Sequence, residues 1–204
     1  KIIPVLIAIV LIIIIGGVAF GSQIVEKYSY SQEKADLYEY FHIVKEEEVP
    51  IILQDALIEQ KAVMSDGVCY FDLDTVHTYF NERFYIDRQE QLLLYTTPTE
   101  VIRTELESSE YRVNGETADA GYRIAFARTA GEETVYYIAA DFVKQYTNFS
   151  YEVFEEPCHM QIYTEWGERQ AADITKNTAV RILGGVKSPI LRQITAGETV
   201  TILE

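Results

Sequence analysis

The chain opens on its longest apolar run. Residues 2–20 carry no charge, and a helix of that length would span about 28 Å at 1.5 Å per residue, close to the thickness of a bilayer's hydrocarbon core. Signal peptides usually have shorter apolar regions, of about 7 to 15 residues. The run therefore predicts a transmembrane helix over residues 1–22, and a cleaved signal peptide is the alternative.

The rest of the chain is predominantly polar. Its long acidic body fits the non-cytoplasmic side of a membrane. We therefore expect a single-pass protein of the cell membrane, with the membrane as partner of residues 2–20 and the body extracellular. Residues 23–48 are polar and aromatic, which predicts a juxtamembrane stem.

Residues 49–168 contain an internal repeat. Residues of the same kind recur 67 positions apart, and the equivalent pairs include Val68/Val135, Tyr70/Tyr137, Asp74/Asp141, Val76/Val143, Tyr79/Tyr146 and Asn81/Asn148. The agreement in both kind and spacing predicts two copies of one supersecondary unit.

Each copy shows the same order of patterns. A β-rich run predicts a strand, apolar residues at helical spacing predict a short helix, and an alternating run predicts a returning strand. Asn81 and Asn148 follow the helices, and asparagine tolerates the left-handed conformation that often ends a helix. Further strands are predicted over residues 49–53, 57–64, 101–106 and 122–128, with a tight turn at Asn114-Gly115.

Charge divides the body. Residues 21–168 have 11 basic and 29 acidic side chains, whereas residues 169–204 have 5 and 3, so we place a domain boundary at Trp166-Gly167-Glu168. The predicted fold class is α+β: a transmembrane helix, a β-rich domain of two similar strand-helix-strand units, and a partial small β-barrel over residues 169–204. The net charge of −15 repels phosphate, which excludes nucleic acid as a partner.

The recurring carboxylates Asp74 and Asp141 are the first candidates for chemistry. Both stand where a helix is predicted to begin, and a carboxylate there caps free N–H groups and interacts favourably with the helix dipole. We therefore interpret both as structural residues. A glycosidase-like fragment around Asp72 is not repeated in the second copy, which has Ala139 there.

Histidine and cysteine give no reactive pattern. His42, His77 and His159 are scattered and lack metal-binding spacing. Cys69 and Cys158 share strand parity with apolar neighbours, which predicts buried thiols, and a disulfide between them stays an alternative. We therefore predict no catalytic, cofactor-binding or metal-binding residue and no cofactor, and the sequence does not identify ligand-binding residues.

The 25 aromatic residues, fifteen of them tyrosines, allow two interpretations. Their alternation favours packing against a sheet. A platform on which sugar rings stack is the less favoured alternative.

Several motifs resemble known families. Arg112-Val113-Asn114-Gly115, residues 134–138, Asp141-Phe142-Val143 and Phe149-Ser150-Tyr151 resemble the stalk-like domain called copper amine oxidase N-terminal-like, which is common in bacterial envelope proteins. The resemblance covers residues 49–164 and implies a spacer in the envelope. Despite the domain's name it implies no copper site, and this sequence offers no ligand set for one.

The last part of the chain is similar to the opening strands of a bacterial Src-homology-3-like domain, on residues 178–181 and 196–203. The whole order of segments is similar to the N-terminal region of membrane-anchored family-18 glycoside hydrolases. The catalytic motif Asp-Gly-x-Asp-x-Asp-x-Glu of that family is absent from these residues.

Two functions follow as expectations. The first is a non-catalytic, membrane-tethered extracellular stalk or adaptor module of a cell-envelope protein, with peptidoglycan or another envelope glycan as candidate partner. The alternative is the N-terminal appendage of a family-18 glycoside hydrolase whose catalytic domain lies beyond residue 204, so whether the full protein is an enzyme stays open. An independent glycan-binding protein is a third hypothesis.

Overall fold

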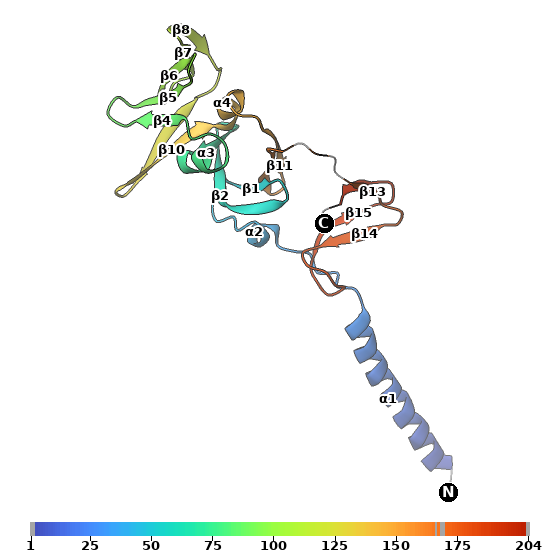
Figure 1. Ribbon diagram of the computed structural model, residues 1–204. Helices are drawn as coiled ribbons and strands as arrows, with labels where there is room; N and C mark the ends of the chain where they lie inside the picture. The colour runs from blue at the N-terminus through green and yellow to red at the C-terminus, as the bar shows by residue number, and fades with distance from the viewer. Residues whose placement is uncertain (1–2, 166, 168–169, 203–204) are drawn as a thin grey trace. The chain divides into compact units, whose positions relative to one another are not determined.

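The structure is a computed structural model that describes residues 3–165, 167 and 170–202 (Figure 1). It is mostly β-sheet, with 46% of residues in strands and 16% in helices. The chain divides into two compact units, one formed by Tyr38–Glu168 and the other by Lys1–Leu37 together with Arg169–Glu204.

The larger unit contains a seven-stranded sheet in the order β11-β12-β1-β2-β3-β10-β9. Its strands are β1 (Glu48–Leu53), β2 (Ala56–Ser65), β3 (Val68–Asp72), β9 (Ala125–Ala130), β10 (Glu133–Ala139), β11 (Ser150–Glu155) and β12 (Cys158–Tyr163). All neighbours pair antiparallel except β1 and β12, which are parallel. The alternation predicted for β12 is confirmed, because Met160 and Ile162 are fully buried on one face.

A second sheet has five antiparallel strands in the order β4-β5-β6-β7-β8. They are β4 (Phe84–Asp87), β5 (Leu92–Thr96), β6 (Val101–Glu105), β7 (Glu110–Val113) and β8 (Glu116–Asp119). The turn predicted at Asn114-Gly115 is confirmed: both residues have positive φ, 51° and 97°, and they join β7 to β8 as two-residue hairpin turns require.

Two short helices pack against one end of the seven-stranded sheet, on β3 and β10. They are α3 (Leu73–Tyr79) and α4 (Ala140–Gln145), and each contacts both β3 and β10. Val76 of α3 and Phe142 of α4 are fully buried. One apolar cluster includes these side chains, the inner face of the large sheet and the inner face of the five-stranded sheet, so the two sheets share one core.

The smaller unit combines segments from both ends of the chain. It contains α1 (Ile3–Tyr28) and two separate two-stranded sheets, β13 (Ala171–Asp173) with β16 (Thr199–Thr201) and β14 (Thr178–Arg181) with β15 (Ile190–Ile194). The short helix α2 (Leu37–Tyr40) spans the point in the sequence where the smaller unit ends and the larger unit begins. The described strands of the predicted barrel start pair in two separate ladders.

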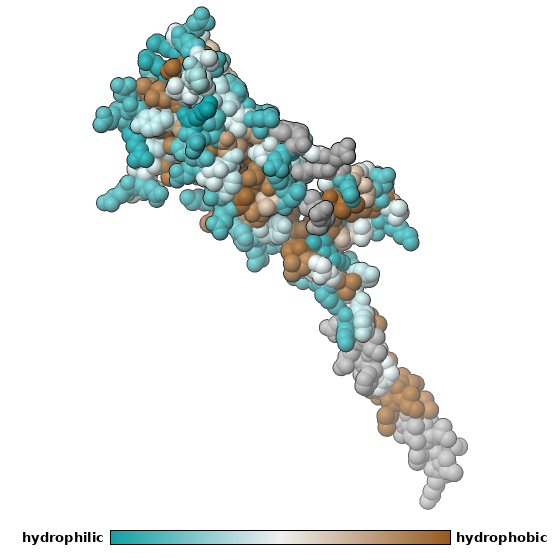
Figure 2. All heavy atoms as spheres, in the orientation of Figure 1, coloured by the Kyte–Doolittle hydropathy of each residue, from teal (hydrophilic) through white to brown (hydrophobic). Residues whose placement is uncertain are grey.

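The predicted transmembrane helix over residues 1–22 is wrong. The helix α1 continues past the predicted span to Tyr28, with Lys27 in its last turn, and its described apolar side chains include Val10, Ile13 and Val18. These side chains are exposed and form a hydrophobic band in Figure 2. Over the residues that the structure describes, no helix combines the length and apolar character that crossing a membrane requires.

The α+β class is corrected to a mainly β fold, because α3 and α4 are only 7 and 6 residues long, whereas 46% of the residues lie in strands and 16% in helices. The predicted left-handed helix ends are also wrong, since neither Asn81 nor Asn148 has positive φ. Asn81 instead links the two copies of the repeat: its side-chain amide donates a hydrogen bond to the Tyr146 carbonyl of the second copy at 3.1 Å.

Candidate functional site

The repeated carboxylates Asp74 and Asp141 are both exposed in the first turn of their helices. The residue that caps α3 is Asp72, whose Oδ1 accepts a hydrogen bond from the Thr75 amide at 2.7 Å, and α4 has no side-chain cap at the equivalent Ala139. The capping role predicted for Asp74 and Asp141 is therefore wrong, although both lie close enough to the helix N-terminus to interact with its dipole.

Asp141 has one specific partner. It accepts a hydrogen bond from the Tyr151 hydroxyl at 2.7 Å. Burial, together with this bond and the negative charge of Asp141, raises the pKa of Tyr151 well above its usual value. The phenol therefore stays protonated at neutral pH and donates to the carboxylate, which is a structural contact.

The three histidines lie in different settings. His77 contacts the Phe84 carbonyl oxygen through Nε2 at 2.6 Å, and His42 occupies a left-handed turn position with φ 54°. His159 is stacked between Phe41 and Phe154, with ring centroids 4.7 Å and 4.9 Å away. Across the described part of the chain, no group of three or more His, Cys, Asp or Glu side chains is arranged to hold a metal ion.

Both cysteines are free thiols. Cys69 is buried beside Met64, with its Sγ 3.9 Å from the Met64 sulfur, and burial raises the pKa of its thiol to about 12. Cys158 is half-buried beside a cavity of about 530 Å³, and burial raises its pKa as well. Since the thiolate is the reactive form, neither residue is poised as a nucleophile at neutral pH.

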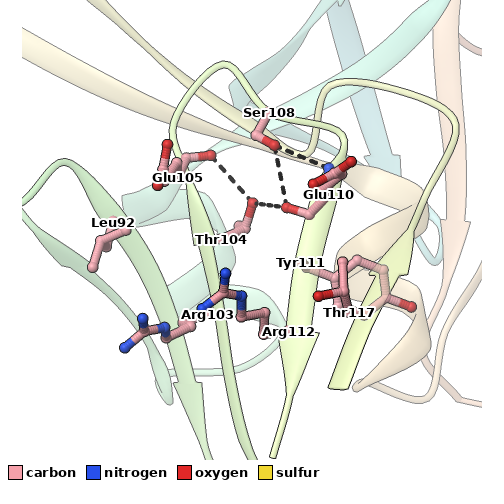
Figure 3. A pocket seen from close by; sticks show the side chains of 9 residues that line it. All are labelled: Leu92, Arg103, Thr104, Glu105, Ser108, Glu110, Tyr111, Arg112 and Thr117. Atoms are coloured by element: carbon pink, nitrogen blue, oxygen red, sulfur yellow. Dashed lines mark hydrogen bonds between the residues drawn. The ribbon is translucent and has the colours of Figure 1, made fainter. Parts of the chain in front are cut away.

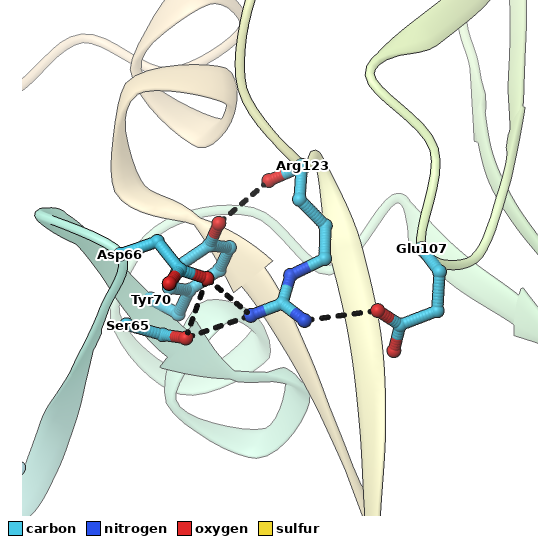
Figure 4. A network of polar contacts seen from close by, with 5 residues as sticks. All are labelled: Ser65, Asp66, Tyr70, Glu107 and Arg123. Carbon is cyan, nitrogen blue, oxygen red and sulfur yellow. Dashed lines mark hydrogen bonds and ion pairs between the residues drawn. The ribbon is translucent and has the colours of Figure 1, made fainter.

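A polar network that no sequence motif indicated surrounds Arg123 (Figure 4). The guanidinium lies 4.2 Å from the centroid of the Phe126 ring, donates to Ser65 Oγ at 2.7 Å and pairs with Glu107 at 2.9 Å. Ser65 ends β2 and Glu107 lies in the loop after β6, so this one side chain joins the two sheets. Its contacts are internal, and we interpret it as a structural clamp.

The outer face of the five-stranded sheet carries a different kind of cluster. Arg103 of β6 and Arg112 of β7 are directly opposite each other, and both are exposed. They flank a cavity of about 170 Å³ (Figure 3), which also includes Glu105 and Glu110 in its lining. A second hollow, of about 300 Å³, is also lined by these two arginines, together with residues at the β7–β8 turn.

The end of the β6–β7 ladder explains the first cavity. Arg103–Arg112 is the last backbone pair of this ladder, and beyond it the buried Thr104 hydroxyl donates to the Glu110 carbonyl at 2.7 Å. A side chain thus replaces the next ladder bond, so the two strands separate there. The sequence alone could have suggested two arginines nine positions apart but not their register.

Most aromatic side chains pack inside the molecule. Phe84, Tyr95 and Phe71 are examples, with exposed fractions of 5% or less. Tyr85 on the outer face of the five-stranded sheet is 61% exposed. These positions agree with sheet packing for most aromatics and leave few rings accessible to a ligand.

The smaller unit has one backbone feature of functional interest. The segment Ser31–Ala35 follows α1 and pairs with the segment before and at the start of β15: the Ser31 amide donates to the Val186 carbonyl at 2.7 Å and the Ile190 amide donates to the Glu33 carbonyl at 2.8 Å. Arg181 reinforces this by donating to the Ser31 carbonyl at 2.9 Å.

Comparisons with known proteins identify no relatives. No family model matches the chain, no curated protein matches it, and no solved structure matches it. The resemblances drawn from motifs therefore stay predictions.

Proposed function

We propose that this chain is a non-catalytic adaptor module of a cell-envelope protein, with peptidoglycan as its candidate partner. The observation that carries the proposal is the pairing of Ser31–Ala35 with the segment around Ile190. Because of this pairing, one compact unit is built from chain segments that precede and follow the larger unit in the sequence.

This topology suits a display role. The chain leaves the smaller unit after Leu37, forms the duplicated unit, and returns to the smaller unit at Arg169. Both ends of the duplicated unit are therefore tied to one scaffold through the backbone. An enzyme needs reactive groups with free, tuned side chains, whereas the conspicuous ones here, Asp72, Cys69 and His159, have structural contacts.

Limited proteolysis tests the pairing. Trypsin should cleave after Lys34 slowly in the full chain, because the adjacent backbone is hydrogen-bonded to Ile190. Arg181→Ala removes the support from Ser31 and should accelerate this cleavage. Arg192→Ala, which removes only the exposed ion pair with Glu198, is the matched control and should leave the rate unchanged. Equal rates in all three proteins would contradict the tie.

Sedimentation with purified peptidoglycan sacculi tests the role. The full chain should be retained in the pellet without releasing soluble fragments from the sacculi. Release of fragments by the purified chain would overturn the non-catalytic role, and the absence of retention would overturn the peptidoglycan contact. Labelling of intact cells should reach the duplicated unit, and labelling seen only after lysis would overturn an envelope location.

A further inference from the structure

We infer that Arg103 and Arg112 form a binding site for the oxyanion groups of an acidic glycan. That a glycan carries the oxyanion rests on the proposed envelope function, whereas the anion contact rests on the geometry of the five-stranded sheet alone.

The two arginines belong to one row of side chains that crosses the whole sheet. The cross-strand partners from β4 to β8 are, in order, Tyr85, Leu94, Arg103, Arg112 and Thr117. Residues directly opposite on neighbouring strands point to the same face, so all five side chains share the outer face. Tyr85, Arg103, Arg112 and Thr117 are exposed.

The pairing of two positive charges has no compensation within the protein. Over the part of the chain that the structure describes, neither guanidinium takes part in a hydrogen bond or an ion pair, and Figure 3 shows the two side chains next to each other, away from Glu105 and Glu110. Like charges directly opposite on a sheet are destabilising. The chain has 32 acidic and 17 basic residues, yet among the described residues neither arginine is paired with an acidic side chain. A bound external anion would therefore relieve the repulsion between the two arginines.

The surroundings indicate on which side the anion would lie. The cavity that contains Glu105 and Glu110 would repel it. The hollow on the other side is lined by Val101, Asn114 and Gly115 besides the two arginines, and none of these is acidic. An oxyanion in this hollow can accept hydrogen bonds from both guanidinium groups, whose planar forks match carboxylate and phosphate.

The same row offers a surface to the sugar that carries the charge. Tyr85 lies three strands from Arg112, about 14 Å away at the usual strand spacing, with Leu94 between Tyr85 and Arg103. An exposed aromatic ring can pack against the apolar face of a sugar ring while the arginines hold the acidic group. The ligand class that fits the row is therefore an oligosaccharide or polyol chain bearing carboxylates or phosphates.

Binding measurements on the full chain test the site. The probes are a hexamer of galacturonic acid, which carries carboxylates, a polyglycerol phosphate, which carries phosphates, and a neutral maltohexaose as the uncharged comparison. The measurements should be made at about 0.15 M salt, where long-range attraction between exposed charges is screened beyond about 8 Å. At least one acidic probe should bind saturably, and the neutral hexamer should bind at least about tenfold more weakly.

The variants separate a built site from general attraction. Arg112→Gln should weaken binding of the acidic probe by about tenfold or more, and Arg112→Lys should weaken it less, because lysine keeps the charge but loses the fork. Arg83→Gln is the matched control: Arg83 is exposed in the loop before β4, outside the row, and its removal changes the net charge equally. It should alter binding by less than twofold.

Three results would overturn the inference: no binding of either acidic probe, equal loss in Arg83→Gln and Arg112→Gln, or equal affinity for the neutral hexamer. Thermal unfolding shows that the variants are folded, and Arg112→Gln should be at least as stable as the parent because it removes a like-charge pair. A negative result here leaves the proteolysis and sedimentation readouts unchanged, so failure of this site and failure of the proposed function are distinguishable.

Discussion

Phe71 and Ile138 face each other across β3 and β10, and they are also equivalent positions of the repeat, 67 residues apart. The pairs on either side exchange equivalents: Tyr70 pairs with Ala139, and Asp72 pairs with Tyr137. A local pseudo-twofold axis therefore passes between Phe71 and Ile138. The two copies meet through their equivalent strands, in the way that two subunits meet in an isologous dimer.

Because Phe71 lies where the two copies of the repeat meet, both copies contribute to one core in the larger unit. The first prediction concerns the stability of that core. Phe71 is fully buried and packs against Phe80, 4.8 Å away between ring centroids. Phe71→Ala should lower the free energy of unfolding by about 3–5 kcal/mol. The measurement is urea unfolding followed by circular dichroism. Tyr85→Ala is the exposed control and should change stability by less than about 0.5 kcal/mol. Equal effects of the two substitutions would contradict the shared core.

A second prediction compares Asn81 with its repeat equivalent Asn148. The amide of Asn81 donates to the Tyr146 carbonyl at 3.1 Å, and its Oδ1 accepts from the Arg83 amide at 3.1 Å, whereas Asn148 is exposed. Asn81→Ala should cost about 1–2 kcal/mol because it leaves a partly buried carbonyl without this donor. Asn148→Ala should cost less than about 0.5 kcal/mol. A larger loss at position 148, measured by chemical unfolding, would show that the copies are tied elsewhere.

The repeat explains how much of the fold was readable from the sequence. Alternation and helical spacing are local, so α3, α4 and the strands next to them could be placed from the pattern. Strand partners are not local. The first copy's hairpin, β4–β5, joins the five-stranded sheet, while the equivalent β11–β12 joins the seven-stranded sheet. Similar local patterns are compatible with either sheet, so the sequence could not distinguish them.

Two other features could not be predicted from the sequence, each for a different physical reason. The pairing of Ser31–Ala35 with Val186–Ile190 uses backbone groups, which leave no side-chain signature. The pairing of Arg103 with Arg112 depends on the register of β6 against β7 across a loop in which Glu107 has φ 66°, an unusual conformation for glutamate that the sequence does not signal. The apolar run at the start of the chain predicted a helix but not its end at Tyr28, because composition alone does not show where a helix ends.

The third prediction concerns the cap that only one copy has. Asp72 accepts from the Thr75 amide at 2.7 Å and from the Thr75 hydroxyl at 2.9 Å. Asp72→Ala should destabilise the protein by about 0.5–2 kcal/mol. Asp74→Ala, two residues later and exposed, should cost less because only its interaction with the helix dipole is lost. Thermal melts at matched concentration measure both, and a greater loss at Asp74 would mean that the cap is misassigned.

The fourth prediction is a pH dependence at Glu48. Partial burial alone would raise its pKa, but hydrogen bonds from Lys61 Nζ at 2.7 Å and from the Val44 amide at 2.9 Å, with the charge of Lys61, outweigh burial and lower the pKa from its usual 4.5. A carboxylate with a lowered folded-state pKa stabilises the fold above its unfolded-state pKa, and this contribution is lost as the pH falls through the folded-state value.

Glu48→Gln should therefore reduce the free energy of unfolding at pH 7, by up to about 1 kcal/mol for a pair this accessible, and the difference from the parent should shrink below pH 4.5. Urea unfolding at several pH values measures it. Glu46→Gln, at an exposed position in the same segment, is the control and should give a smaller difference at every pH. A difference between the two proteins that grows below pH 4.5 would show that folding raises the pKa of Glu48 instead of lowering it.

The last prediction uses the two thiols. Burial raises the pKa of Cys69 to about 12, with smaller contributions from Cys158 and Asp141, so the thiol is almost entirely protonated at pH 8. Cys158 is half-buried and its pKa is also raised, but its side chain is more accessible. An aromatic disulfide reagent at pH 8 should therefore modify Cys158 first. In Cys158→Ser the remaining Cys69 should react only slowly in the folded protein and rapidly in urea, whereas Cys69→Ser should keep the faster phase. Rapid modification of Cys69 without urea would show that β2 and β3 separate readily and expose the core.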